Sequence, residues 1–211
     1  MRSITLPANH RGSLPLRVAL CLTLARIVIS PILLIVYLYY QQLGLSLQLL
    51  PYVMLSILTV SELSDIFDGY VARKYDQVTD LGKILDPMAD SIARISLFFT
   101  FTQGIVQIPL LLVLVFLYRD VFISMLRTLC ALRGVALAAR TSGKIKAVIQ
   151  AIAAYAVIVI MIPYSLGKIT LAQFQSTSMI VVAAAALYTL ASGIEYIMAN
   201  LIYIKMAWSK K

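Results

Sequence analysis

Acidic residues are concentrated in one stretch of this chain. Seven of the nine fall between positions 62 and 90: Glu62, Asp65, Asp68, Asp76, Asp80, Asp86 and Asp90. Only four bases accompany them, namely Arg73, Lys74, Lys83 and Arg94, which leaves three negative charges without a partner. A charge held away from water needs compensation. A bound cation is the simplest source of it.

Four of these carboxylates form two pairs with helical spacing. Asp65 and Asp68 are three residues apart and Asp86 and Asp90 four apart, so each pair shares one face of a helix. A donor set made only of oxygen, without histidine or cysteine, suits a hard cation such as Mg²⁺ or Mn²⁺. The spacing therefore predicts a metal site where two helices face each other.

Small residues and one arginine accompany the first acid pair. Gly69 follows Asp68, and Ala72 lies one turn beyond it on the same face, which leaves space beside the acids. Arg73 offers a bidentate donor for phosphate at the edge of that space. Gly82, before the second pair, is equally well explained as a turn glycine.

Membrane helices must position these residues. Of the 211 residues, 61% are hydrophobic and 13% charged, which excludes an ordinary water-soluble enzyme and a disordered chain. About 20 apolar residues cross a bilayer, and glycines such as Gly134 and Gly167 separate such blocks. Pro87 either begins the third block or kinks it. The sequence predicts an all-α, six-helix membrane bundle forming one domain, 1–211, with spans near 18–41, 45–67, 85–106, 108–130, 145–165 and 177–204.

Basic residues predict the orientation of the bundle. Lys and Arg collect at both ends of the chain and in the connections near 68–84 and 131–144, whereas those near 42–48 and 104–108 have none. The positive-inside rule then places the tail 1–17, the carboxyl end and the acid pairs at the cytoplasmic face. This placement explains the net charge of +9. We expect contact with membrane lipids and no nucleic-acid partner, because aromatic-flanked basic platforms are absent.

Two further residue types carry simpler expectations. Cys21 and Cys130 lie in apolar runs without metal-type spacing and are interpreted as buried thiols. Tyr37, Tyr39 and Tyr40 are expected to mark the membrane interface at the far end of the first span.

The stretch SDIFDGYVARKYDQVTDLGKILDPMAD resembles the signature of the CDP-alcohol phosphotransferase family. The matching residues are Asp65, Asp68, Gly69, Ala72, Arg73, Gly82, Asp86 and Asp90. The resemblance implies a six-helix membrane bundle, commonly a homodimer, with a polar cavity open to the cytoplasm. In members of that family, an alcohol acceptor displaces CMP from a CDP-linked donor.

The resemblance also implies roles for these positions. Two Mg²⁺ or Mn²⁺ ions would be held by Asp65, Asp68, Asp86 and Asp90. Asp90 would in addition be the catalytic base that deprotonates the acceptor hydroxyl. The donor would be bound by Gly69, Ala72, Arg73 and Gly82, with Arg73 at its diphosphate.

Bases elsewhere in the chain predict an acceptor that carries phosphate. Arg119 lies inside the fourth span with only Asp120 adjacent, where an unpaired arginine is costly. Several bases converging on the cytoplasmic side would favour a phosphate group. The candidate ligands are Arg26, Arg119, Arg127, Lys144 and Lys146.

The segments RDVFISMLR and SGKIKAVIQ are similar to bacterial phosphatidylglycerophosphate synthases, although Asp120 and Ala147 replace their usual Glu and Thr. This resemblance implies transfer of a phosphatidyl group from CDP-diacylglycerol to sn-glycerol 3-phosphate, in a bacterial inner membrane. Inositol phosphate, serine or an amino-alcohol is the alternative acceptor. A small cation transporter is the alternative of another class. The bunching of the acids at one face and the arginines beside them count against a transporter.

Overall fold

The computed structural model describes residues 27–74, 80–135, 137 and 140–209, with side chains except at 65–74, 80–87 and 207–209. In this part of the chain all regular structure is helical, as predicted. The first helix is Ile27–Leu38, and it is followed by α2 (Leu50–Lys74), α3 (Asp80–Phe101), α4 (Leu110–Leu132), α5 (Thr141–Ser165) and α6 (Leu171–Ser209).

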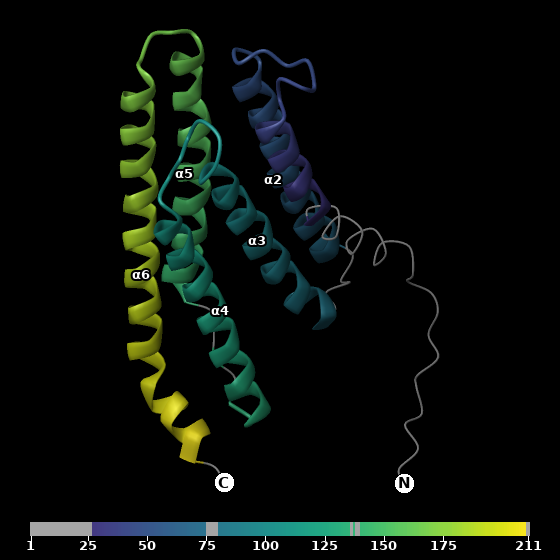
Figure 1. Ribbon diagram of the computed structural model, residues 1–211. Coiled ribbons are helices and arrows are strands. Elements are labelled where there is room, and N and C mark those ends of the chain that lie inside the picture. Colours follow the sequence, from purple (N-terminus) through teal and green to yellow (C-terminus); the bar gives the residue numbers. More distant parts are fainter. Residues whose placement is uncertain (1–26, 75–79, 136, 138–139, 210–211) are drawn as a thin grey trace.

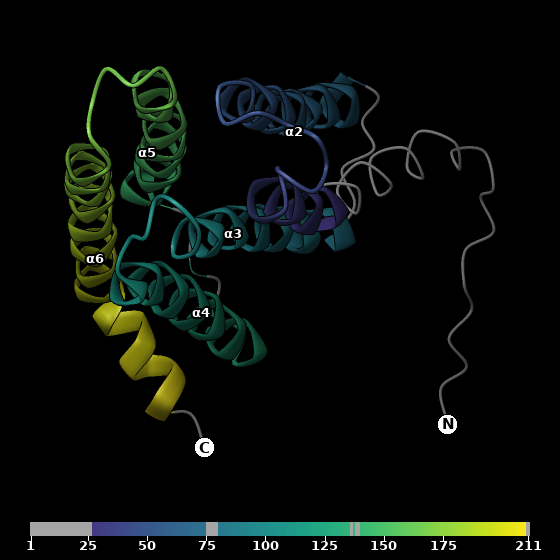
Figure 2. The ribbon, with the colours of Figure 1, turned by 45° about the horizontal axis from the view of Figure 1, so that its top comes forward.

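The helices form a bundle in which α5 and α6 run side by side (Figures 1 and 2). α6 also packs against α4, while α3 contacts both α4 and α5, and α2 contacts α5. The first helix and α2 lie on the opposite side of the bundle from α6 (Figure 1). α3 therefore lies against both α4 and α5, the two helices that also pack against α6.

Several helices extend beyond the predicted spans. α2 continues past residue 67 to Lys74, α5 begins at Thr141 rather than 145, and α6 begins at Leu171 rather than 177. α3 begins at Asp80, so the alternative in which this helix starts at Pro87 is wrong. Hydropathy marks the part of a helix that suits lipid, whereas the backbone hydrogen bonds continue into polar residues.

Glycine ends two of the helices that carry the site. At the end of α5, Gly167 has φ 69°, its N–H donates to the carbonyl of Tyr164 at 3.0 Å, and the N–H of Lys168 donates to the carbonyl of Pro163 at 2.9 Å. These bonds satisfy carbonyls that the helix itself leaves open. α4 ends in the same way at Gly134, with φ 76°. Both glycines mark helix ends, as predicted.

The apolar core is divided by charged residues. The main core joins all six described helices, and a smaller cluster joins α4 to α6 through Ile123, Leu126 and Tyr196. On α4, Arg119 and Asp120 lie between Phe116 of the main core and Ile123 of the smaller cluster. Cys130, further along α4, is a buried free thiol, as predicted; Cys21 lies outside the described residues.

Tyr37 is a buried residue at the end of the first helix. Its side chain is 2% exposed, and its hydroxyl donates to the carbonyl of Gln103 at 3.0 Å. The same oxygen accepts the N–H groups of Ile105 and Val106, each at 3.0 Å. Tyr37 therefore anchors the first helix to the connection between α3 and α4.

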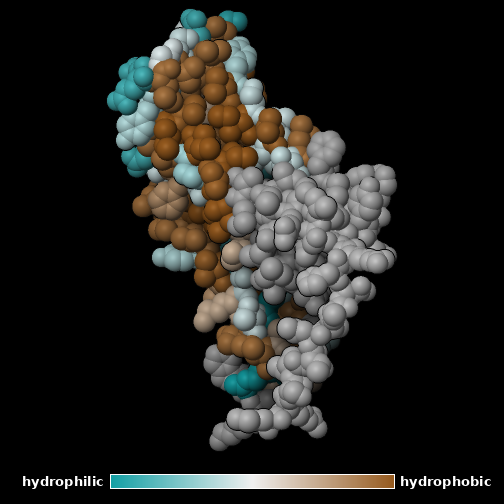
Figure 3. All heavy atoms as spheres, turned by 90° about the vertical axis from the view of Figure 1, so that its right-hand side faces the viewer, coloured by the Kyte–Doolittle hydropathy of each residue, from teal (hydrophilic) through white to brown (hydrophobic). Residues whose placement is uncertain are grey.

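The described surface is rich in apolar side chains. α5 and the Leu171–Met206 part of α6 are long and apolar enough to cross a membrane, and the first helix and Leu50–Ser64 are shorter apolar helices. Figure 3 shows hydrophobic side chains gathered over the upper part of the face that carries the first helix and α2. Exposed apolar residues of these two helices include Val28, Ile32, Ile35, Tyr52 and Val60.

Candidate active site

A cavity with many charged residues in its lining lies between α3, α4 and α5. Its volume is about 510 Å³, and it also reaches the turn before α5. Six basic side chains line it, namely Arg94, Arg119, Arg127, Arg140, Lys144 and Lys146, together with two carboxylates, Asp90 and Asp120. This excess of positive charge suits an anionic ligand, because phosphate and arginine form strong charge-assisted hydrogen bonds.

Asp120 is the centre of a buried ionic network on the cavity wall. Lys146 Nζ contacts its two oxygens at 2.6 and 2.9 Å, and Arg119 contacts one of them at 3.1 Å. The Ser91 hydroxyl donates to the other oxygen at 3.0 Å. The side chains of Asp120 and Lys146 are 8% and 6% exposed. One carboxylate thus ties α3, α4 and α5 together.

Asp120 pairs with only part of the Arg119 guanidinium. One terminal nitrogen contacts Asp120, and Nε is buried without a hydrogen-bond partner among the described residues. Two glycines border the side chain: a Cβ on Gly143 would lie 3.5 Å from the second terminal nitrogen, and one on Gly193 would lie 3.0 Å from Cγ. The arginine is confined, and its buried Nε has no hydrogen-bond partner among the described residues.

α6 holds two other bases of the cavity. Arg127 donates through Nε to the Tyr196 hydroxyl at 3.0 Å, and its guanidinium carbon lies 5.1 Å from the centre of that ring. Arg140, just before α5, forms an ion pair with Glu195 at 3.0 Å. Neighbouring residues of α6 therefore orient arginines from two other segments.

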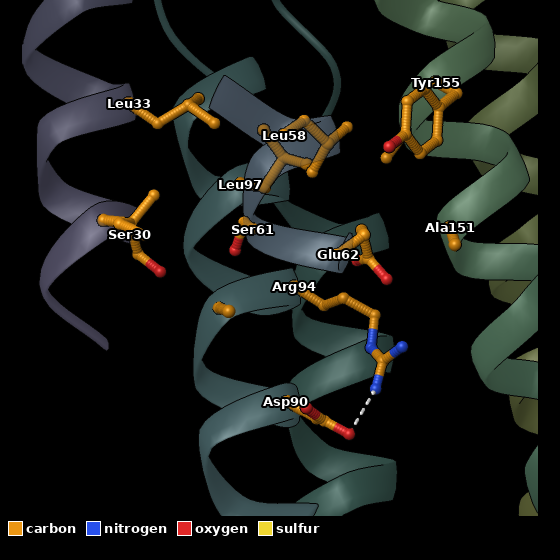
Figure 4. Close-up of a pocket in the computed structure, with 13 residues that line it drawn as sticks. Ser30, Leu33, Leu58, Ser61, Glu62, Asp90, Arg94, Leu97, Ala151 and Tyr155 are labelled. Atoms are coloured by element: carbon orange, nitrogen blue, oxygen red, sulfur yellow. Dashed lines mark ion pairs between the residues drawn. The ribbon is translucent and has the colours of Figure 1, made fainter. Parts of the chain in front are cut away.

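Asp90 and Arg94 connect this cavity with a smaller one. They are one turn apart on α3 and form an ion pair at 3.6 Å. Both also line a pocket of about 40 Å³ between the first helix, α2, α3 and α5. Figure 4 shows Glu62 of α2 and Tyr155 of α5 on the wall of this pocket. Asp90 is thus a carboxylate on the wall of both the larger and the smaller cavity.

The structure brings together five of the residues expected from the sequence. Asp90, Arg119, Arg127, Lys144 and Lys146 all line the larger cavity. The sequence predicted from charge that the bases converge, and the structure shows that these five residues come from three helices. Lys146, however, faces Asp120, whereas Lys144 is exposed at the start of α5.

For the other residues expected at the site, the structure describes no side chain. Arg26 lies outside the described residues, and so do the side chains of Asp65, Asp68, Gly69, Ala72, Arg73, Gly82 and Asp86. The described backbone places the first acid pair on α2 and the second on α3, so the helical spacing of each pair holds. Among the described side chains, no group of three or more His, Cys, Asp or Glu could hold a metal ion.

Sequence reasoning missed several residues of the site. Arg94 could have been found, because it follows Asp90 by four positions on one helix. Arg140, Glu195 and Tyr196 carry no such signal, since their contacts join segments more than 50 positions apart.

Comparison with known proteins finds relatives that match most of this chain. The CDP-alcohol phosphatidyltransferase family matches residues 16–191. A CDP-diacylglycerol–glycerol-3-phosphate 3-phosphatidyltransferase of Bacillus subtilis is 31% identical over 185 residues, 85% of this chain and 92% of that protein. One of Rickettsia typhi is 34% identical over 131 residues, 61% of this chain and 68% of that protein. A probable phosphatidylglycerophosphate synthase of Mycobacterium tuberculosis is 29% identical, covering 83% and 78%. This chain belongs to the CDP-alcohol phosphatidyltransferase family.

Proposed function

We propose that the protein transfers the phosphatidyl group of CDP-diacylglycerol to sn-glycerol 3-phosphate, forming phosphatidylglycerophosphate and releasing CMP. The observation that carries this proposal is the basic cavity with Asp90 on its wall. Its excess positive charge suits an acceptor that itself bears phosphate. The names of the relatives from Bacillus subtilis and Rickettsia typhi support the same donor and acceptor.

The reaction assigns one bond-forming and one bond-breaking step. The acceptor hydroxyl oxygen attacks the phosphorus that carries the diacylglycerol, and the bond from that phosphorus to the oxygen of CMP breaks. Asp90 takes the hydroxyl proton, as a carboxylate within hydrogen-bond reach can do. Arg119, Arg127 and Lys144 bind the acceptor phosphate, with Lys146 beside them and Arg26 a further proposed ligand.

The donor is proposed to bind at the motif on α2 and α3. Gly69, Ala72 and Gly82 would leave room for the nucleotide, and Arg73 would bind its diphosphate. Four carboxylates form a donor set that fits Mg²⁺ or Mn²⁺, so Asp65, Asp68, Asp86 and Asp90 are proposed to hold two ions. Such ions supply charge neutralisation during phosphoryl transfer.

We further propose that this chain is an integral protein of the bacterial inner membrane and forms one domain with six membrane spans. Both termini and the cavity would face the cytoplasm, where the basic connections lie. The apolar surfaces of α5 and α6 support membrane insertion. A homodimer is proposed from the family resemblance.

The test is CMP release by the purified protein in detergent with CDP-diacylglycerol and Mg²⁺ or Mn²⁺. Glycerol 3-phosphate, inositol phosphate, serine and no acceptor are compared. We expect release only with glycerol 3-phosphate, and its loss in Asp90→Asn. Asp76→Asn, an acid of the same stretch outside the motif, is the matched control and should stay active. Release with another acceptor would contradict the proposed specificity, and no release with any acceptor from folded protein would contradict the reaction.

A further inference from the structure

Asp120 receives hydrogen bonds from three helices at once. Ser91 of α3, Arg119 of α4 and Lys146 of α5 all donate to its carboxylate, at 2.6 to 3.1 Å. The Lys146 ammonium lies against both oxygens. Lys146 is therefore already bound within the protein, and its effect on a ligand would pass through Asp120.

Stability alone does not explain such a network. A buried ion pair loses hydration, and replacing it with apolar residues of similar size is often neutral or stabilising. Asp120 and Lys146 are both more than nine-tenths buried. A role of this ion pair in positioning neighbouring groups explains why the protein keeps it although its desolvation costs free energy.

The network connects Asp90 with Arg119, the two groups that the proposed reaction must align. Ser91 follows Asp90 directly in the chain, and Arg119 precedes Asp120. The hydrogen bond from Ser91 to Asp120, 3.0 Å long, therefore links the helix of the proposed base to the proposed phosphate ligand. Misplacement of reacting groups by about 1 Å can cost about a hundredfold in rate.

We propose that Asp120 is a positioning residue: through Ser91 and Lys146 it sets the register of α3 against α4 and α5, and with it the separation of Asp90 and Arg119. This inference rests on the proposed function, since it assigns Asp90 and Arg119 to one reaction. In this role Asp120 acts through the residues that it holds and not through contact with the substrate.

Two sets of variants test it, with kcat and both KM values measured. Ser91→Ala removes one hydrogen bond, worth about 1 kcal/mol or about a fivefold change. We expect kcat to fall by about that factor, with the KM for CDP-diacylglycerol unchanged. Ser96→Ala is the matched control, because this half-buried serine of α3 lies outside the cavity lining.

The second set replaces the pair by apolar residues, as Asp120→Leu with Lys146→Met. We expect a folded protein whose unfolding temperature is lowered, because the buried Arg119 loses its carboxylate partner, with kcat lowered at least tenfold and a raised KM for glycerol 3-phosphate. Adding Ser91→Ala to it should have less than a twofold further effect, because the hydrogen-bond acceptor is already absent.

The outcomes separate this inference from the proposed function. Wild-type kinetics in Ser91→Ala would overturn the inference, and so would a folded apolar double variant with wild-type kcat. An equal rise in the KM of both substrates would indicate general damage and would also overturn it. Wild-type protein without acceptor-dependent CMP release would instead contradict the proposed function itself.

Discussion

Replacing Arg119 by lysine is expected to weaken use of the acceptor without unfolding the protein. Lysine keeps the positive charge beside Asp120, so the buried carboxylate retains a partner. It loses the planar guanidinium, whose Nε has no hydrogen-bond partner among the described residues. Arg119 can donate to a phosphate through Nε and a terminal nitrogen, whereas lysine presents a single ammonium.

The expected magnitude follows from one lost charge-assisted hydrogen bond. Such a bond contributes about 1.5 to 3 kcal/mol, which corresponds to about a 10- to 150-fold loss of kcat/KM. We expect this loss for glycerol 3-phosphate and less than a twofold change in the KM for CDP-diacylglycerol. CMP release measured against each substrate in turn gives both values.

Arg133→Lys provides the control for this experiment. Arg133 is exposed at the end of the same helix and lies outside the cavity lining, so its kinetics should remain those of the wild type. An unchanged kcat/KM in Arg119→Lys would refute the assignment of Arg119 to the acceptor. A selective rise in the KM for CDP-diacylglycerol would place Arg119 at the donor instead.

Three other perturbations have expected outcomes. Tyr37→Phe leaves the N–H groups of Ile105 and Val106 without their acceptor, so the free energy of unfolding in detergent should fall by about 2 to 4 kcal/mol. Tyr39→Phe, at an exposed ring, is the control, and an equal fall there would contradict the role of the Tyr37 hydroxyl. Gly193→Ala should raise the KM for glycerol 3-phosphate several-fold, because the new Cβ would lie 3.0 Å from Cγ of Arg119. The unfolding temperature should stay equal or rise, because alanine favours the helix by about 1 kcal/mol. Unchanged kinetics in this variant would show that Arg119 adjusts freely. A chelator should abolish CMP release and Mg²⁺ or Mn²⁺ should restore it, and full activity in the chelator would contradict the proposed metal site.

Local features of the site could be predicted from the sequence because they depend on helical spacing. The acid pairs share helix faces at separations of three and four residues, and the described backbone keeps both pairs in helices. The high cost of an unpaired arginine in a span singled out Arg119, which the structure pairs with Asp120. The helix bounds were less predictable, because hydropathy reports the apolar part of a helix and not its hydrogen-bonded ends.

Charge alone could not distinguish the positions of Lys144 and Lys146. The sequence assigned both to the acceptor phosphate, yet residues two apart on a helix point to different faces. Lys146 therefore turns inward to Asp120, and Lys144 remains exposed. The helical period could have separated them, but it could not have identified Asp120 as the partner.

The sequence by itself determined the helical class, the grouping of the acids and the excess of bases, since these follow from composition and from spacing along single helices. Only the tertiary structure decided which charges meet. Ser91 and Lys146 lie 29 and 26 positions from Asp120, and Tyr196 lies 69 positions from Arg127. Such contacts arise from the packing of α3, α4, α5 and α6, in which one face of each helix is buried against another segment, and no local period encodes that pairing.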